Sequence, residues 1–170
     1  MWPYRGASWI VLFLFALLIQ TSILPLMFPP GYVPSLVLPV VVLIAGYENP
    51  QRGLLVGAIG GLMMDMWAGR AWGLNTFPYA LVGYGVAVIQ SKIVRDQVFV
   101  PGLLAGLAVV FLLPVQWVLL LIGGYHFHWV TYAQPLPSSV LFSMLMTPAL
   151  GGILGLRSRY DVQTRYGSYF

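Results

Sequence analysis

The stretch "GGLMMDMWAGRAWGLN", residues 60–75, places one carboxylate, Asp65, at the end of a glycine-rich apolar run, and Arg70 follows five residues later. The run before Arg70 resembles a membrane helix, where an unpaired charge costs about 2.5–3.5 kcal/mol at the centre and less near an end. A second apolar segment starts close to Asn75. We therefore interpret the stretch as a tight turn between two transmembrane helices, with Asp65 in need of a partner.

The composition around this turn is that of an integral membrane protein. The 170 residues are 59% hydrophobic and only 7% charged, whereas soluble domains carry about 25% charged residues. Crossing a bilayer takes about 20 apolar residues, so there is room for about six helices. We predict an all-α integral membrane protein with one polytopic domain over 1–170, a single bundle whose spans are about 7–28, 33–47, 51–68, 74–91, 98–123 and 136–156.

Local signals support several of these boundaries. Residues 7–28 form a run that is too long for a signal peptide and lacks a small-residue cleavage site, so we interpret it as a span. Asn49 and Pro50 suit the cap and the first position of the third helix, and Asn75 or Thr76 can cap the fourth. Because Pro39 falls inside the second segment, we expect a kink or a broken helix there.

The basic residues indicate an orientation. With six spans and a cytoplasmic N-terminus, only Arg70 lies on the outer side, and the other seven are cytoplasmic: Arg5, Arg52, Lys92, Arg95, Arg157, Arg159 and Arg165. This distribution follows the positive-inside rule. We expect both termini in the cytoplasm and the tail arginines close to membrane lipids, where anionic headgroups attract them.

Small residues recur every four positions on three of the expected helices. The rows are Gly53, Gly57, Gly61, Asp65 and Gly69; Ser143, Thr147, Gly151 and Gly155; and the pair Gly102 and Gly106. Such rows let helix backbones approach closely in a membrane. They serve either packing within the chain or the docking of a partner helix, and the spacing leaves both alternatives open.

Asp65 has three possible roles. It can hold the hairpin together through Arg70 or through the free N–H groups near Asn75 and Thr76, which attract a carboxylate. It can also contribute to a partner-binding surface, or couple to a proton or a solute. The hairpin role is favoured, because both local partners lie within the turn.

The sequence offers no set of residues for catalysis, a metal or a cofactor. There is no cysteine, and His126 and His128 have no nearby acid to complete a metal site. Nucleophile elbows, phosphate loops and zinc-protease motifs are also missing. No basic run with interleaved aromatic residues indicates nucleic-acid binding. We therefore expect a protein that is not an enzyme and binds no cofactor.

The ordered pattern of residues 53–87, "GLLVGAIGGLMMDMWAGRAWGLNTFPYALVGYGVA", resembles the rod shape-determining protein MreD family, as does the upstream "VPSLVLPVVVLIAGYENPQRG". The residues that match the family pattern are Gly57, Gly61, Asp65, Gly73 and Asn75. The turn departs from the commoner small, uncharged version at Arg70, Ala71 and Trp72, so a salt bridge from Arg70 to Asp65 would be peculiar to this chain.

The resemblance implies a non-enzymatic scaffold in the bacterial cell inner membrane, within the elongation machinery that controls peptidoglycan synthesis and rod shape. It implies binding to MreC, a single-span periplasmic protein, and through it an indirect link to MreB and to RodA with its class B transpeptidase. The family's fold is similar to the substrate-binding subunits of energy-coupling-factor transporters. That likeness supplies the alternative, a solute-binding membrane subunit of a vitamin-type transporter.

Overall fold

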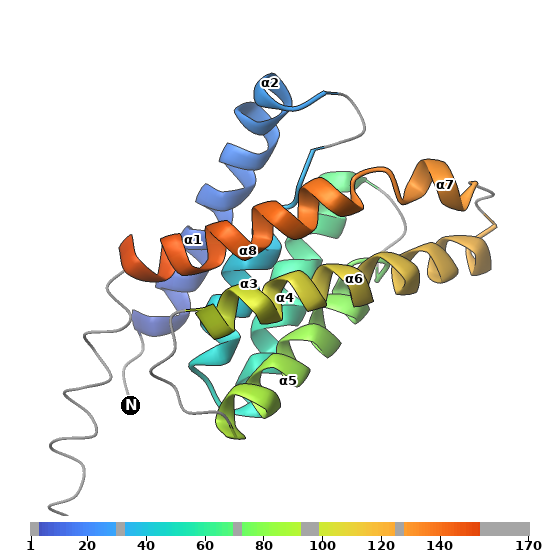
Figure 1. Cartoon of the computed structure of the whole chain (residues 1–170). Helices are drawn as coiled ribbons and strands as arrows, with labels where there is room; N and C mark the ends of the chain where they lie inside the picture. Colours follow the sequence, from blue (N-terminus) through green and yellow to red (C-terminus); the bar gives the residue numbers. More distant parts are fainter. Residues whose placement is uncertain (1–3, 30–32, 70–72, 93–98, 125–127, 154–170) are drawn as a thin grey trace, which may run out of the picture.

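The computed structural model describes residues 4–29, 33–69, 73–92, 99–124 and 128–153 (Figure 1). Two short helices, α2 (Leu24–Met27) and α7 (Trp129–Tyr132), accompany six longer ones. The longer helices are α1 (Tyr4–Ser22), α3 (Val37–Gly46), α4 (Pro50–Ala68), α5 (Thr76–Lys92), α6 (Phe99–Ile122) and α8 (Leu136–Ile153). The predicted all-α class is confirmed, and each longer helix falls on one expected span.

Within the described residues, three segments are long and apolar enough to cross a membrane: Trp9–Met27, Phe99–Ile122 and Leu136–Ile153. They correspond to α1 with α2, to α6 and to α8. Helix α4 has the length of a span, but its four glycines, Arg52 and Asp65 lower its hydropathy. The chain is therefore a multi-pass membrane protein with three clear candidate spans, and the count of six remains a proposal.

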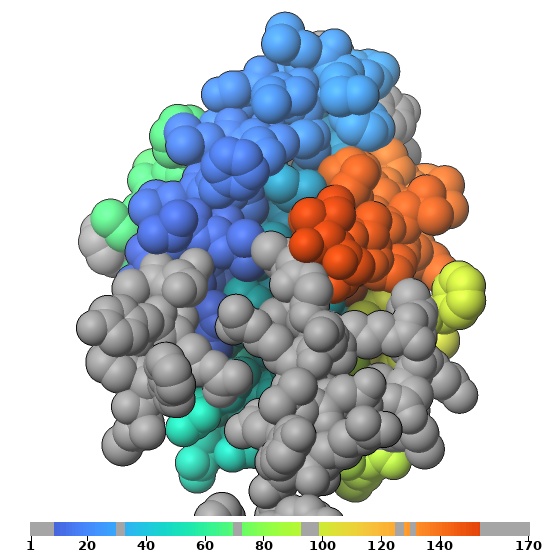
Figure 2. All heavy atoms as spheres, turned by 90° about the vertical axis from the view of Figure 1, so that its left-hand side faces the viewer, coloured from blue at the N-terminus to red at the C-terminus, as the bar shows by residue number. Residues whose placement is uncertain are grey.

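Helix α3 lies at the centre of the bundle and contacts α1, α4, α5, α6 and α8. All of its ten residues are buried. In Figure 2, α1 and α8 flank this helix, and little of its surface shows between them. Ten residues extend only about 15 Å, half of the roughly 30 Å hydrocarbon core, so α3 is a core helix that is too short to span alone.

The expectation of a kink or break at Pro39 is wrong. Helix α3 begins at Val37, four residues later than the segment predicted from residue 33. Pro39 therefore lies in the first turn, where a backbone N–H has no partner within the helix, and its missing donor breaks no hydrogen bond. The β-branched residues that follow continue the helix without interruption.

Helices α4 and α5 pack backbone to backbone along the glycine row of α4. A Cβ added to Gly61 would lie 2.6 Å from both the carbonyl oxygen of Asn75 and the Cα of Thr76. Added at Gly57, it would clash with the carbonyl oxygen of Tyr79, one turn further along α5. Of the two alternatives for this row, packing within the chain is the one that the structure contains.

The other small-residue rows are also used internally. A Cβ on Gly102 of α6 would lie 2.6 Å from the carbonyl oxygen of Met144 in α8. Ser143 and Thr147 are buried, and a Cβ on Gly151 would meet Leu43 of α3 at 3.2 Å. Gly155 lies outside the described residues. The α6–α8 pair is thus a second close helix contact, and like α4–α5 it is made through small residues.

Candidate functional site

Asp65 is a buried acid near the end of α4. Its side chain is 2% exposed, and it continues the glycine row that faces α5. The helix ends three residues later at Ala68, and Thr76 starts α5. Gly73 just before α5 has a φ of 106°, a left-handed conformation that glycine adopts without strain. The acid therefore faces the beginning of the next helix across a short turn.

The Asp65 carboxylate accepts five hydrogen bonds from residues that precede or start α5. Oδ1 accepts the backbone N–H and the side-chain Nδ2 of Asn75, each at 2.9 Å. Oδ2 accepts the N–H of Gly73 at 2.9 Å, the N–H of Thr76 at 3.0 Å and the Thr76 hydroxyl at 2.6 Å. Two carboxylate oxygens have about four lone-pair sites, so the acceptor capacity of Asp65 is filled.

This arrangement explains how an acid is tolerated at this position. The first N–H groups of a helix have no partner within that helix, and its N-terminus carries partial positive charge. Asp65 satisfies the N–H of Thr76, the first residue of α5, and those of Gly73 and Asn75 just before it, and in return they stabilise its negative charge. Asn75, which we expected to cap α5 with its own side chain, instead directs Nδ2 to Asp65. The cap of α5 is therefore supplied by the preceding helix.

A chain of amide groups extends from this cap to α6 and α7. The Oδ1 of Asn75 accepts a hydrogen bond from Nε2 of Gln116 in α6. The Oε1 of Gln116 accepts one from the hydroxyl of Tyr132 in α7 at 3.4 Å. We refer to Asp65, Gly73, Asn75, Thr76, Gln116 and Tyr132 as the Asp65 cluster. It joins four helices at one end of the bundle.

A second cap of the same kind lies at the start of α3. The Oε1 of Gln20, from α1, accepts the N–H of Leu36 at 2.9 Å and the N–H of Val37 at 3.2 Å. Ser35 bonds to the hydroxyl of Tyr79 in α5 at 3.1 Å. At the start of α3 and at the start of α5, backbone N–H groups thus donate to a side chain from another helix. No bulk water is available for this task in a membrane interior.

The structure brings together most of the residues predicted from the sequence. Gly57, Gly61, Asp65, Gly73 and Asn75 all lie along the α4–α5 contact or at its end. Arg70, the other expected partner of Asp65, lies outside the described residues.

Sequence reasoning missed Gln20 and Gln116, which are uncharged and stand singly in long apolar runs. Their amide side chains could have indicated a contact. A primary amide within a membrane helix needs a hydrogen-bond partner, so a single glutamine in an apolar run predicts a contact with another helix.

The Asp65 cluster is suited to a structural role, because its groups hydrogen-bond to one another and connect helices. Among the described residues, no group of three His, Cys, Asp or Glu side chains could hold a metal ion. The acid is enclosed by donors that belong to the backbone and to two neighbouring side chains. What the cluster can do is fix the angle and register between α4 and α5, and tie that hairpin to α6 and α7.

Comparison with known proteins identifies the family. Searches of curated proteins and of solved structures gave no significant match. The family model described as rod shape-determining protein MreD matches residues 3–154, which include the eight helices of the described part of the chain and the Asp65 cluster. The chain therefore belongs to the rod shape-determining protein MreD family and has a role in rod shape determination.

Proposed function

We propose that this protein is a non-enzymatic scaffold of the cell elongation machinery in the bacterial inner membrane. In this proposal it binds an MreC-like single-span periplasmic protein and helps to control peptidoglycan synthesis, with MreB and the RodA synthase reached indirectly. Family membership supports the role in shape. The proposal that the protein is not an enzyme rests on one observation. The acceptor sites of the Asp65 carboxylate are occupied by donors just before and at the start of α5.

In this proposal the surface for a partner helix lies away from the glycine row of α4. Partner docking was one of two alternatives for that row, but Gly53, Gly57 and Gly61 are covered by α5. Large apolar side chains remain exposed on α1, including Val11 at 65%, Phe15 at 61% and Leu18 at 59%. A membrane partner would have to pack on such outer faces.

The alternative of a solute-binding transporter subunit receives less support. A site for a vitamin-like solute needs a few convergent polar groups in a cavity. The cavity between α5 and α6 is lined by nine apolar residues, from Leu81 to Phe111. The buried polar groups of the Asp65 cluster, in contrast, bond to one another.

Copurification from native membranes tests the scaffold proposal. The tagged chain, solubilised in a mild detergent, is expected to retain a single-span periplasmic protein of the MreC type. A multi-pass protein of similar size with the same tag serves as the control. Depletion of the chain is expected to turn rods into spheres. The proposal fails if no such partner is retained and depleted cells stay rod-shaped.

The alternative is tested on the same preparation. A vitamin-type subunit should carry a bound small molecule that mass spectrometry detects, and it should copurify with an ATPase. Its thermal stability should also rise when that solute is added. Finding a bound solute and an ATPase, without an MreC-like protein, would favour the transporter subunit over the scaffold.

A further inference from the structure

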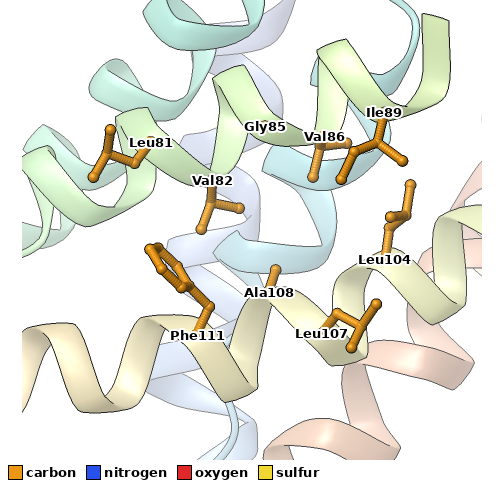
Figure 3. Close-up of a pocket in the computed structure, with 9 residues that line it drawn as sticks. All are labelled: Leu81, Val82, Gly85, Val86, Ile89, Leu104, Leu107, Ala108 and Phe111. Carbon is orange, nitrogen blue, oxygen red and sulfur yellow. The ribbon is translucent and has the colours of Figure 1, made fainter. Parts of the chain in front are cut away.

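An apolar groove of about 370 Å³ runs between α5 and α6 (Figure 3). Sites for small ligands occupy about 300–1,000 Å³, so the groove has the size of a binding site. Its walls include Leu81, Gly85 and Ile89 of α5 and Leu104, Leu107 and Phe111 of α6. The groove exists partly because Gly85 has no side chain, and the space that its Cβ would occupy is open.

The groove faces outward at membrane depth. Helix α6 is one of the three clear candidate spans, and on it Leu107 is 58% exposed and Phe111 50% exposed. On the opposite wall Ile89 is 44% exposed. An occupant must therefore be apolar and able to enter from the hydrocarbon region.

The length of the groove distinguishes an acyl chain from a partner helix. On α5 the groove occupies residues 81–89, a rise of about 12 Å, which is less than half of the roughly 30 Å hydrocarbon core. On α6 the groove occupies residues 104–111, which belong to the first half of a helix that continues to Ile122. A transmembrane partner helix would need a surface along the whole span, whereas one lipid chain extends through a single leaflet.

A positively charged residue, Lys92, lies just beyond the end of the groove on α5. Lys92 follows Ile89 by three residues and Gly85 by seven, so all three share one face of α5. Lys92 is exposed and belongs to the last turn of α5. An ammonium group at this position complements the phosphate of a lipid whose chain lies in the groove, and it favours a headgroup with net negative charge.

We propose that the groove between α5 and α6 binds one acyl chain of an anionic phospholipid from the leaflet next to Lys92, and that Lys92 pairs with the phosphate. This inference goes beyond the scaffold function, because it involves no partner protein. Binding would fill the space beside Gly85 and link α5 to α6, whose direct contact is less extensive than that of α4 with α5.

Native mass spectrometry of the full chain tests the proposal with two probes, phosphatidylglycerol and phosphatidylethanolamine of the same acyl chains. The wild type is expected to retain phosphatidylglycerol preferentially. Lys92→Gln should reduce that retention about five-fold, the effect of one basic residue near an anionic surface. Gly85→Leu should abolish retention of both lipids, because leucine fills the groove.

Matched controls keep these outcomes interpretable. Gly152→Leu changes another helical glycine with open space around it, and Arg52→Gln removes a basic residue from α4, which does not line the groove. Both are expected to bind lipid as the wild type does, and unchanged helicity establishes that every variant is folded. Equal retention of the two lipids by the wild type would overturn the proposal. So would equal binding by Gly85→Leu and Gly152→Leu, or loss of a copurified protein rather than lipid in Gly85→Leu.

Discussion

Asp65 at the end of α4 accepts both the backbone N–H and the side-chain amide of Asn75, each at 2.9 Å. Asp65 lies on α4 and Asn75 directly precedes α5, the next helix of an antiparallel pair, and their contact closes the pair at one end. Along the rest of the pair, Gly57 and Gly61 let α5 approach the backbone of α4. A single acid and a row of glycines thus determine how the hairpin is built.

Replacing the carboxylate should lower the stability of the protein in a graded way. Asp65→Ala leaves five donors without an acceptor, and we expect a loss of at least about 1–3 kcal/mol, the cost of leaving a buried donor unsatisfied. Asp65→Asn keeps one carbonyl oxygen and should lose less. Folded yield after detergent extraction and thermal unfolding measure both effects.

The control for this series is Ser91→Ala, near the far end of α5. The exposed Ser91 hydroxyl bonds to the carbonyl oxygen of Val88 in its own helix at 2.7 Å, so removing it should cost no more than about 1 kcal/mol. Equal yields for Asp65→Ala and Asp65→Asn would contradict the capping role.

Adding one methyl group to the glycine row should separate α4 from α5. In Gly61→Ala the new Cβ meets backbone atoms of Asn75 and Thr76 at 2.6 Å, and overpacking of this kind costs about 1–3 kcal/mol. The measurement is the midpoint of thermal unfolding. Gly152→Ala is the control, because no atom lies within 4 Å of its added Cβ, and it should be neutral or slightly stabilising. If both variants unfold at the same temperature, the close packing of this hairpin is refuted.

The cap of α3 should depend on the amide of Gln20. Gln20→Leu removes the acceptor for the N–H groups of Leu36 and Val37, and an unsatisfied buried donor costs about 1–3 kcal/mol. Thr21→Val is the neighbouring control, since the Thr21 hydroxyl bonds only to carbonyl groups of its own helix at Leu17 and Leu18. Thermal unfolding should shift clearly in the first variant and little in the second. Similar shifts in both would argue against a cap from α1.

The orientation that we propose from the basic residues can be measured directly, because the chain has no native cysteine. Arg70→Cys should react with a membrane-impermeant thiol reagent added to the periplasmic side, and Arg159→Cys should react only after the membrane is opened. Labelling of position 159 but not 70 in intact cells would reverse the proposed topology.

Much of the fold could be predicted from the sequence, because glycine, proline and charge mark the ends of apolar runs. The start of α4 at Pro50 and the start of α5 at Thr76 fall within two residues of their predicted positions. The role of α3 could not be predicted, since an apolar run of this length is compatible with either a span or a core helix. Only the packing of five other helices around it decides between them.

The candidate site was predictable where its partners are close in sequence. Asp65 and Asn75 are ten residues apart, and helix termini attract carboxylates, so their contact followed from local rules. Gln116 lies 41 residues beyond Asn75, and Gln20 lies 16 residues before Leu36. Contacts over such separations depend on how helices are arranged in three dimensions, and neither spacing nor composition identifies them.

The central claim is that Asp65 acts by capping α5, and a double-mutant cycle tests it most directly. Asp65→Asn, Thr76→Val and their combination are compared with the wild type by reversible unfolding in mixed micelles. Because the Thr76 hydroxyl lies 2.6 Å from Oδ2 of Asp65, we predict a coupling free energy of about 1–3 kcal/mol. Effects of the two substitutions that simply add, with no coupling, would contradict the account.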